Sequence, residues 1–258
     1  MKAPKEPVIG KCHLCGNIRE LQGSHVWPKF AYKQYVSNLK KGGQFIDLHK
    51  DEVTSEQYVR PWFCSCCEQL LGRTENRAAR ICRKLDNDEE VEYDEQFHRF
   101  VTSISWRSLK LRYEDEPLGA VRNKWPAFSI WQRYLRESRT GIAPYTQHVF
   151  AAPNQPHGMD KGLGGHVIVA EGLVLSQIGP ITIVGLLAPD RLTEHEKPTW
   201  ANSMVRQTGG KITPIKQWVF GDGDAKKLNI TTRLAALLKA FEDHRIERLL
   251  TGNWGKVT

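Results

Sequence analysis

Hydrophobic positions along the chain repeat with two periods, one typical of helices and one typical of strands. In residues 97–113, for example, Phe97, Phe100, Val101 and Ile104 recur at helical spacing. From Gln147 onward, strand-like runs alternate with Gly and Pro, a pattern that predicts an antiparallel sheet. The predicted helices cover residues 28–39, 68–81, 97–113, 127–138 and 229–250. The predicted strands lie within residues 44–48, 58–63, 147–152, 165–179 and 181–189.

These elements predict an α+β fold, and a chain of 258 residues is long enough for one large domain or two modest ones. The run DNDEEVEYDE at residues 86–95 is strongly acidic, which is typical of a solvated linker. We therefore predict two domains. Residues 1–95 form the first, and residues 96–258 form a mixed α+β domain that positions DNA or regulates the first.

The charge of the protein is distributed unevenly between these two parts. Residues 1–95 contain 15 Lys and Arg against 15 Asp and Glu, whereas residues 96–258 contain 22 against 14 and carry the whole net charge of +8. A positive field attracts polyanions, so we expect a nucleic acid as partner, although many charged helix faces are only solvated. The residues predicted to neutralise its phosphates are Arg99, Arg107, Lys110, Arg133 and Arg136.

The chain has no sequence feature that predicts a membrane or secreted protein. The N-terminal stretch MKAPKEPVIGK lacks the apolar core of a signal peptide, and the longest apolar run, residues 181–188, is too short to cross a bilayer. We therefore expect a cytoplasmic protein without a membrane partner. In that reducing compartment six clustered cysteines favour metal binding over a disulfide framework.

Two Cys-x-x-Cys pairs, Cys12 with Cys15 and Cys64 with Cys67, are the strongest local motif of the sequence. Zinc is often held by four thiolates in a tetrahedron, and each pair can supply two of them. We predict a structural zinc site, because a zinc ion with four thiolates has no open position for chemistry. Cys66 in place of Cys67 is the alternative ligand, and buried cysteines without metal are the alternative to the site.

The sequence SHVWPKF lies between the two cysteine pairs and begins at Ser24. The order Cys-x-x-Cys, Ser-His-x-x-Pro and Cys-x-x-Cys-Glu, followed by a second Glu in a helix, resembles the HNH endonucleases, whose ββα-metal core is often braced by zinc. The resemblance covers residues 12–80 and is closest to bacterial members that read Ser-His-x-x-Pro-Lys-Phe. Several of these occur in phage-defence or mobile-element settings. The resemblance implies a zinc-braced nuclease module in residues 1–95, DNA as substrate with RNA kept open, and a partner protein from the same defence system.

The same resemblance implies roles for individual residues. His25 stands where the family has its general base, and a histidine can take a proton from water near neutral pH. Ser24 and Glu68 stand where the family has metal ligands. Glu75 lies seven residues after Glu68 on the same helical face and could bind the ion or orient a ligand. The predicted catalytic residues are therefore His25, Glu68 and Glu75, with Ser24, Glu68 and Glu75 holding a catalytic Mg²⁺ or Mn²⁺ ion.

One part of the family motif is missing from this chain. The Asn expected in the middle of the motif is not evident in SEQYVRPWF at residues 55–63, where Gln57 is a candidate replacement. Two other functions therefore stay open. The first is a zinc-dependent nucleic-acid-binding or adaptor protein that does not cleave nucleic acid. The second is a regulatory subunit whose zinc knuckle, formed by the Cys-x-x-Cys pairs, binds another protein.

Overall fold

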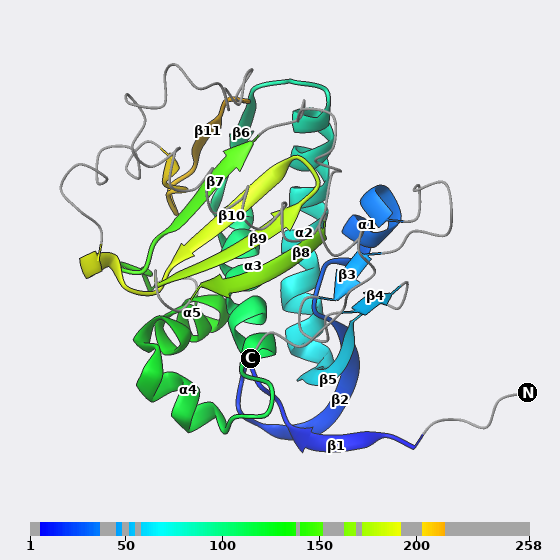
Figure 1. Cartoon of the computed structure of the whole chain (residues 1–258). Coiled ribbons are helices and arrows are strands. Elements are labelled where there is room, and N and C mark those ends of the chain that lie inside the picture. Colours follow the sequence, from blue (N-terminus) through cyan, green and yellow to red (C-terminus); the bar gives the residue numbers. More distant parts are fainter. Residues whose placement is uncertain are drawn as a thin grey trace, which may run out of the picture.

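The computed structural model describes residues 6–36, 45–47, 52–54, 58–137, 140–151, 163–168, 172–191 and 203–214. Helices and strands are mixed, which confirms the predicted α+β class (Figure 1). The helices are α1 (Lys29–Ala31), α2 (Ser65–Asp86), α3 (Glu95–Arg112), α4 (Leu118–Lys124) and α5 (Pro126–Arg136), with a π-helix η1 (Tyr32–Val36) and a 3-10 helix η2 (Pro189–Arg191). The strands are β1 (Val8–Lys11), β2 (Ile18–His25), β3 (Phe45–Asp47), β4 (Glu52–Thr54), β5 (Val59–Cys64), β6 (Val91–Tyr93), β7 (Gln147–Ala151), β8 (Leu163–Ile168), β9 (Leu173–Ile178), β10 (Ile181–Leu186) and β11 (Gly210–Ile212).

The N-terminal part is an antiparallel sheet with strand order β1-β2-β5, followed directly by the long helix α2. In the β2–β5 pair, Leu21 lies opposite Cys64 and His25 lies opposite Val59. α2 begins at the residue after β5 and packs against both β2 and β5. The strand pair and the helix that follows it therefore form one compact unit.

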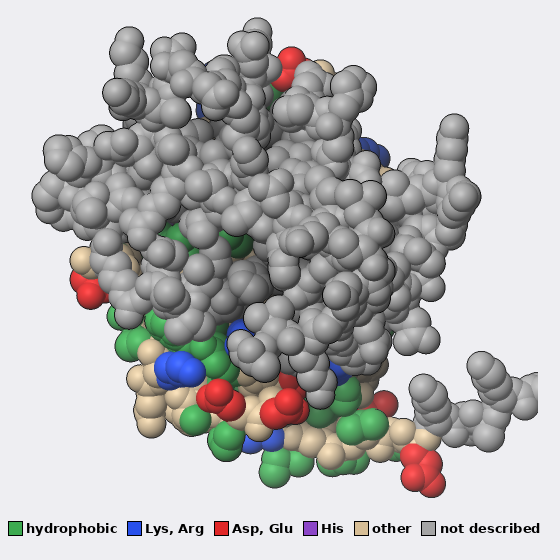
Figure 2. Space-filling view, in the orientation of Figure 1, with side chains coloured by type: hydrophobic (Ala, Val, Ile, Leu, Met, Phe, Trp, Pro, Cys, Tyr) green, Lys and Arg blue, Asp and Glu red, His purple; other side chains and the backbone are tan. Residues whose placement is uncertain are grey.

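This sheet carries exposed apolar side chains, most of them on the edge strand β1 and its neighbour β2. The large hydrophobic side chains that are exposed in the described residues all belong to β1, β2 or β5. Figure 2 shows hydrophobic side chains reaching the surface around this edge. They are Val8, Ile9, Ile18 and Val59.

The apolar stripe of α2 explains both its length and its position. Leu71, Ala78, Ile81 and Leu85 recur at helical spacing and are all buried against the strands and α3. The stripe continues past the predicted end at residue 81, so the helix is longer than predicted. α2 ends at Asp86, two residues before Asp88, whose backbone is left-handed with φ 61°.

Gly72 interrupts α2 at a position where alanine would fit. A Cβ at Gly72 would meet no heavy atom within 4 Å. Because glycine inside a helix costs about 0.5–1 kcal/mol relative to alanine, Gly72→Ala is expected to raise the free energy of unfolding by that amount. Urea denaturation followed by circular dichroism measures the change. Gly185→Ala is the matched control and is expected to destabilise, because its Cβ would lie 2.8 Å from the Trp131 ring; equal effects of the two changes would contradict the packing described.

The second sheet confirms the predicted antiparallel arrangement. Its strand order is β7-β10-β9-β8, and every neighbouring pair is antiparallel. The turn between β9 and β10 contains Gly179 with φ 54°, and a Cβ there would overlap the ring of Tyr35 from η1. The second sheet is therefore packed closely against the N-terminal part.

α3 lies at the centre of the molecule, between α2 and the second sheet (Figure 1). Every residue from Phe97 to Leu111 is buried. Asp94 caps the N-terminus of α3: its side chain accepts a hydrogen bond of 3.2 Å from the backbone N–H of Phe97. Polar side chains of α3 find partners inside the protein, as Ser108 does with Ser176 at 2.9 Å.

In the described residues, the parts of the chain on the two sides of the predicted domain boundary at residue 95 share a hydrophobic core. One continuous hydrophobic core includes Leu14 and Leu71 from the first predicted domain and Trp131 and Ile183 from the second. α3 belongs to this core over most of its length, so the chain on either side of residue 95 packs together.

The predicted solvated linker at residues 86–95 is wrong. Its middle forms β6, which pairs antiparallel with β11. Val91 and Tyr93 are buried while Glu92 between them is exposed, so an acidic run still supplies a strand with one apolar face. α4 was not predicted, and the helix predicted at residues 229–250 lies outside the described residues.

Candidate metal centre and active site

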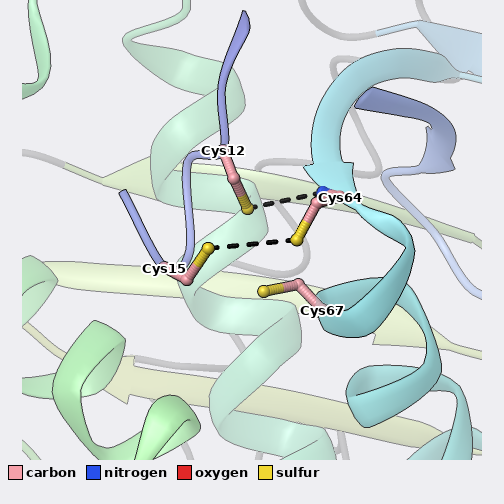
Figure 3. A group of neighbouring side chains, drawn as sticks. All are labelled: Cys12, Cys15, Cys64 and Cys67. Atoms are coloured by element: carbon pink, nitrogen blue, oxygen red, sulfur yellow. Dashed lines mark hydrogen bonds between the residues drawn. The ribbon is translucent and has the colours of Figure 1, made fainter. Parts of the chain in front are cut away.

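Four cysteines come together at the N-terminal end of α2 (Figure 3). The ligand atoms of Cys12, Cys15, Cys64 and Cys67 all lie within 4.8 Å of one another, and the sulfurs of Cys15 and Cys64 are 3.9 Å apart. Four thiolates around zinc at a bond length of about 2.3 Å have sulfurs about 3.8 Å apart, whereas a disulfide brings two sulfurs to about 2.05 Å. The cluster predicted from the two Cys-x-x-Cys pairs is therefore present and could hold a metal ion such as zinc.

Local backbone geometry places these sulfurs. The turn between β1 and β2 is closed by hydrogen bonds of 2.8 Å from Cys12 N–H to the Asn17 carbonyl and from Gly16 N–H to the Cys12 carbonyl. Gly16 has φ 82°, a conformation that favours glycine. Cys64 ends β5, and Cys67 lies in the first turn of α2. The pairing of β2 with β5 then brings the two knuckles together.

Burial and amide N–H groups act in opposite directions on the thiol of Cys12. Burial raises its pKa, but hydrogen bonds from backbone amides, including that of Cys64 at 3.4 Å, lower the pKa of Cys12 from 9.0 to about 7. Burial is the largest cause that raises the pKa of Cys67 far above its usual range, and negative charge on Cys12 is the second. Several thiolates cannot share so small a buried space unless a cation neutralises them, which is the role of a structural metal ion.

The other two cysteines of the chain lie outside the cluster. Cys66 is exposed, and its sulfur lies 3.9 Å from Nη1 of Arg19. Cys82 is fully buried in the apolar stripe of α2. The structure therefore favours the predicted Cys67 over the alternative Cys66 as the fourth cysteine of the site.

The first knuckle is also fixed by residues from the C-terminal half, which sequence reasoning missed. Nε2 of Gln132 on α5 donates to the carbonyl oxygens of His13 at 2.6 Å and Leu14 at 3.0 Å. The His13 ring stacks on Trp62, and burial together with the positive charge of Lys110 lowers the pKa of His13 to about 4. A neutral, packed His13 and the amide of Gln132 hold the turn rigid. Nothing in the local sequence around Gln132 indicates this contact.

His25 is the last residue of β2, at the far end of the strand pair from the cysteines. Its side chain is half buried, and its ring centroid lies 6.4 Å from that of Tyr32. The following residue is fixed by a hydrogen bond of 2.9 Å from Val26 N–H to the Tyr58 carbonyl. From Leu21, which pairs with Cys64, β2 extends about 13 Å to His25, and α2 rises about 15 Å from its start to Glu75, so the two residues lie at similar distances from the cysteine end.

Arg107 of α3 joins His25 to Glu75. Its Nη1 donates to the backbone carbonyl of His25 at 3.3 Å, and both Nη1 and Nη2 donate to Oε1 of Glu75 at 3.0 Å. The side chain of Arg107 is only 2% exposed, against 21% for Glu75, and its guanidinium lies over the ring of Phe63 at 5.8 Å. Oε1 of Glu75 is thus occupied by the arginine, while Oε2 makes no hydrogen bond with any residue in the described ranges.

Ser24 and Glu68 lie outside the Arg107 contacts. The hydroxyl of Ser24 is buried where β2 bulges against β5, and it donates to the Gln22 carbonyl and accepts from Phe63 N–H, both at 3.2 Å. Glu68 lies in the first turn of α2 beside Cys67, about 10 Å along the helix from Glu75. Their roles as metal ligands therefore stay predictions.

The structure does not gather His25, Glu68 and Glu75 into one ligand group. Among the described residues, the four cysteines form the only set of three or more His, Cys, Asp or Glu side chains placed to share an ion. What the fold does bring together is the backbone of His25 and the carboxylate of Glu75.

Three of the five residues predicted to contact nucleic acid are buried, and this part of the prediction is wrong. Arg99, Arg107 and Lys110 lie on α3 and are 6%, 2% and 2% exposed. Arg99 donates to the Leu135 carbonyl at 2.5 Å, and Lys110 donates to the Glu114 carbonyl at 3.0 Å. The polar side of α3 faces other parts of the protein, so these cations serve the fold.

The remaining two predicted contacts have a different environment. Arg133 and Arg136 are exposed near the C-terminal end of α5, so they stay candidates for phosphate contact. Gln57, the suggested replacement for the missing Asn, lies outside the described residues.

Comparison with known proteins gave no match: no protein-family model, no curated protein sequence and no solved structure corresponds to this chain. Each helix within the described ranges is too short or too polar to cross a membrane. A function therefore has to be inferred from the chain's own residues.

Proposed function

We propose that the protein is a zinc-braced endonuclease of the HNH type that uses a divalent metal ion to hydrolyse phosphodiester bonds in DNA. The main support is the joint position of His25 and Glu75, because Arg107 contacts both of them. His25 ends β2, and Glu75 lies on α2, the helix that directly follows the paired strand β5. The order of motifs in residues 12–80 is the second support. A role in phage defence, and a partner protein from such a system, rest on that resemblance alone.

In this proposal His25 is the general base. Its half-buried ring would accept a proton from a water molecule as the water oxygen forms a bond to phosphorus and the bond to the leaving 3′-oxygen breaks. Arg107 is a positioning residue. By holding the carbonyl of His25 and the carboxylate of Glu75 from one guanidinium, it would keep the base and the carboxylate in a fixed relation.

One carboxylate oxygen of Glu75 could bind a hard divalent ion such as Mg²⁺ or Mn²⁺. Oε2 of Glu75 keeps its lone pairs, and oxygen ligands of this kind suit such ions. Arg107 already neutralises Glu75, so an ion there needs more negative charge, which Mg²⁺ sites commonly take from substrate phosphates. When bound, the ion would stabilise negative charge on the scissile phosphate and on the leaving oxygen.

Cleavage of a labelled DNA duplex by zinc-loaded protein tests the proposal. We expect cleavage only after Mg²⁺ or Mn²⁺ is added, with 5′-phosphate and 3′-hydroxyl ends on the products, measured on denaturing gels with end-group analysis. Ca²⁺ and a buffer without added metal are the controls, because a strong chelator would also remove the zinc. Retained DNA binding without cleavage in either ion would contradict the nuclease and favour the non-catalytic adaptor.

A further inference from the structure

α2 carries a row of basic residues on its solvent side that the proposed active site does not use. Arg73, Arg77, Arg80 and Lys84 follow one another at intervals of four, three and four residues, so they line one side of the helix, with Arg83 beside them. Arg77 is half exposed and the others are exposed. This basic stripe of α2 is about 16 Å long, given a rise of about 1.5 Å per residue.

Acidic residues of α2 lie on a different side of the helix. Glu75 is held by Arg107, and Asp86 accepts hydrogen bonds from Gln34 at 2.9 Å and Tyr35 at 2.8 Å. These contacts turn the carboxylates toward α3 and η1. The charges of α2 are therefore segregated: Glu68, Glu75 and Asp86 share one side of the helix, and the basic residues face solvent on another.

The basic stripe is not what a merely solvated helix face would carry. Such a face gains from opposite charges four residues apart, whereas Arg73 with Arg77 and Arg80 with Lys84 place like charges at that spacing, which destabilises a helix. Only Arg77 has an acidic partner, Asp94 at 3.0 Å; Arg73, Arg80 and Lys84 form no ion pair within the described part of the chain. Three exposed positive charges on one rigid element are thus left for an external anion.

We infer that the basic stripe of α2 binds the phosphate backbone of DNA; the choice of DNA rests on the function proposed above. One strand of duplex DNA presents a phosphate every ~3.4 Å along its axis, so the stripe spans about five phosphates. Gly72 lies between the stripe and Glu75, and even a Cβ there would meet no heavy atom within 4 Å, so bound DNA has open surface toward the active site. Backbone contacts of this kind position DNA without reading its sequence.

Salt-dependent binding tests this inference with a matched pair of variants. Fluorescence anisotropy of a fluorescein-labelled DNA duplex would be recorded with zinc-loaded protein, no catalytic metal and a series of NaCl concentrations. Because each lost phosphate contact lowers the slope of log K against log salt by about 0.9, R73Q/R80Q/K84Q is expected to lower it by about 2.7 and to weaken binding at least tenfold at moderate salt. R122Q/K124Q on α4, which removes two exposed cations that have no assigned role, is the control and is expected to leave the slope unchanged.

The outcomes separate this inference from the nuclease. An unchanged slope for the α2 variant, or an equal loss in the α4 variant, would overturn the inference even if the wild type cuts DNA. Stripe-dependent binding by a wild type that never cuts would leave the inference standing and overturn the nuclease. A wild type that neither binds nor cuts the duplex would overturn both.

Discussion

If the four cysteines hold a structural zinc ion, Cys64→Ser is expected to abolish zinc binding and to unfold most of the N-terminal part. Cys64 ends β5 and precedes α2, and its sulfur lies 3.9 Å from that of Cys15, so serine removes one of the four thiolates that join the two knuckles. Structural zinc sites bind with apparent free energies of about 10–16 kcal/mol, which is comparable with the whole stability of a typical domain, about 5–15 kcal/mol. We expect a melting temperature at least 10 °C lower or no cooperative transition, with zinc content measured by mass spectrometry and unfolding by circular dichroism.

Cys66→Ser is the matched control for this change. Cys66 is two residues away but exposed and outside the cluster, so the variant is expected to keep one zinc ion per chain and the melting temperature of the wild type. Removing the metal from wild-type protein with a strong chelator should reproduce the effect of Cys64→Ser. If Cys64→Ser instead melts like the wild type, the four cysteines are not a structural metal site.

His25→Ala is expected to abolish DNA cleavage while leaving the fold intact. Loss of a general base typically lowers a rate by about 10²–10⁴-fold. The fold should survive the substitution, because the His25 side chain is only half buried and is not part of the hydrophobic core. Arg107 contacts the backbone of His25, so that contact survives the substitution. Single-turnover cleavage rates at saturating Mg²⁺ or Mn²⁺, with zinc content and melting temperature checked in parallel, measure the effect.

Lys29→Ala is the control for His25→Ala. Lys29 is exposed and lies only four residues further along the chain, in the first residue of α1. Its removal is expected to leave the cleavage rate close to that of the wild type. Equal losses in the two variants would mean that the cleavage rate depends on the conformation of residues 25–29 and not on the imidazole of His25.

Features that depend on local sequence were predictable here. The two Cys-x-x-Cys pairs predicted the cluster because each knuckle is a short turn whose geometry needs few distant contacts. The apolar period of residues 68–81 predicted α2, and the run at 181–189 predicted β10, since both patterns match the side that each element buries.

Features that depend on tertiary contacts were not predictable. The polar side of α3 looked like a solvent-facing basic surface, but α2, α5 and the second sheet cover it, so Arg107 became a buried link between His25 and Glu75. The acidic run at 86–95 looked like a linker because charge dominates it, yet Val91 and Tyr93 alternate within it and build a strand. In both places the partner elements lie far away in the sequence.

The most direct test of the proposed nuclease is the conversion of supercoiled plasmid by zinc-loaded wild type and His25→Ala protein, side by side, in Mg²⁺ or Mn²⁺. The proposed function predicts that the wild type produces nicked or linear plasmid and that His25→Ala, equally folded and equally zinc-loaded, leaves the plasmid supercoiled. If both proteins retard the plasmid on a gel and neither cuts it, the zinc-braced fold binds DNA without hydrolysing it and His25 has a structural role.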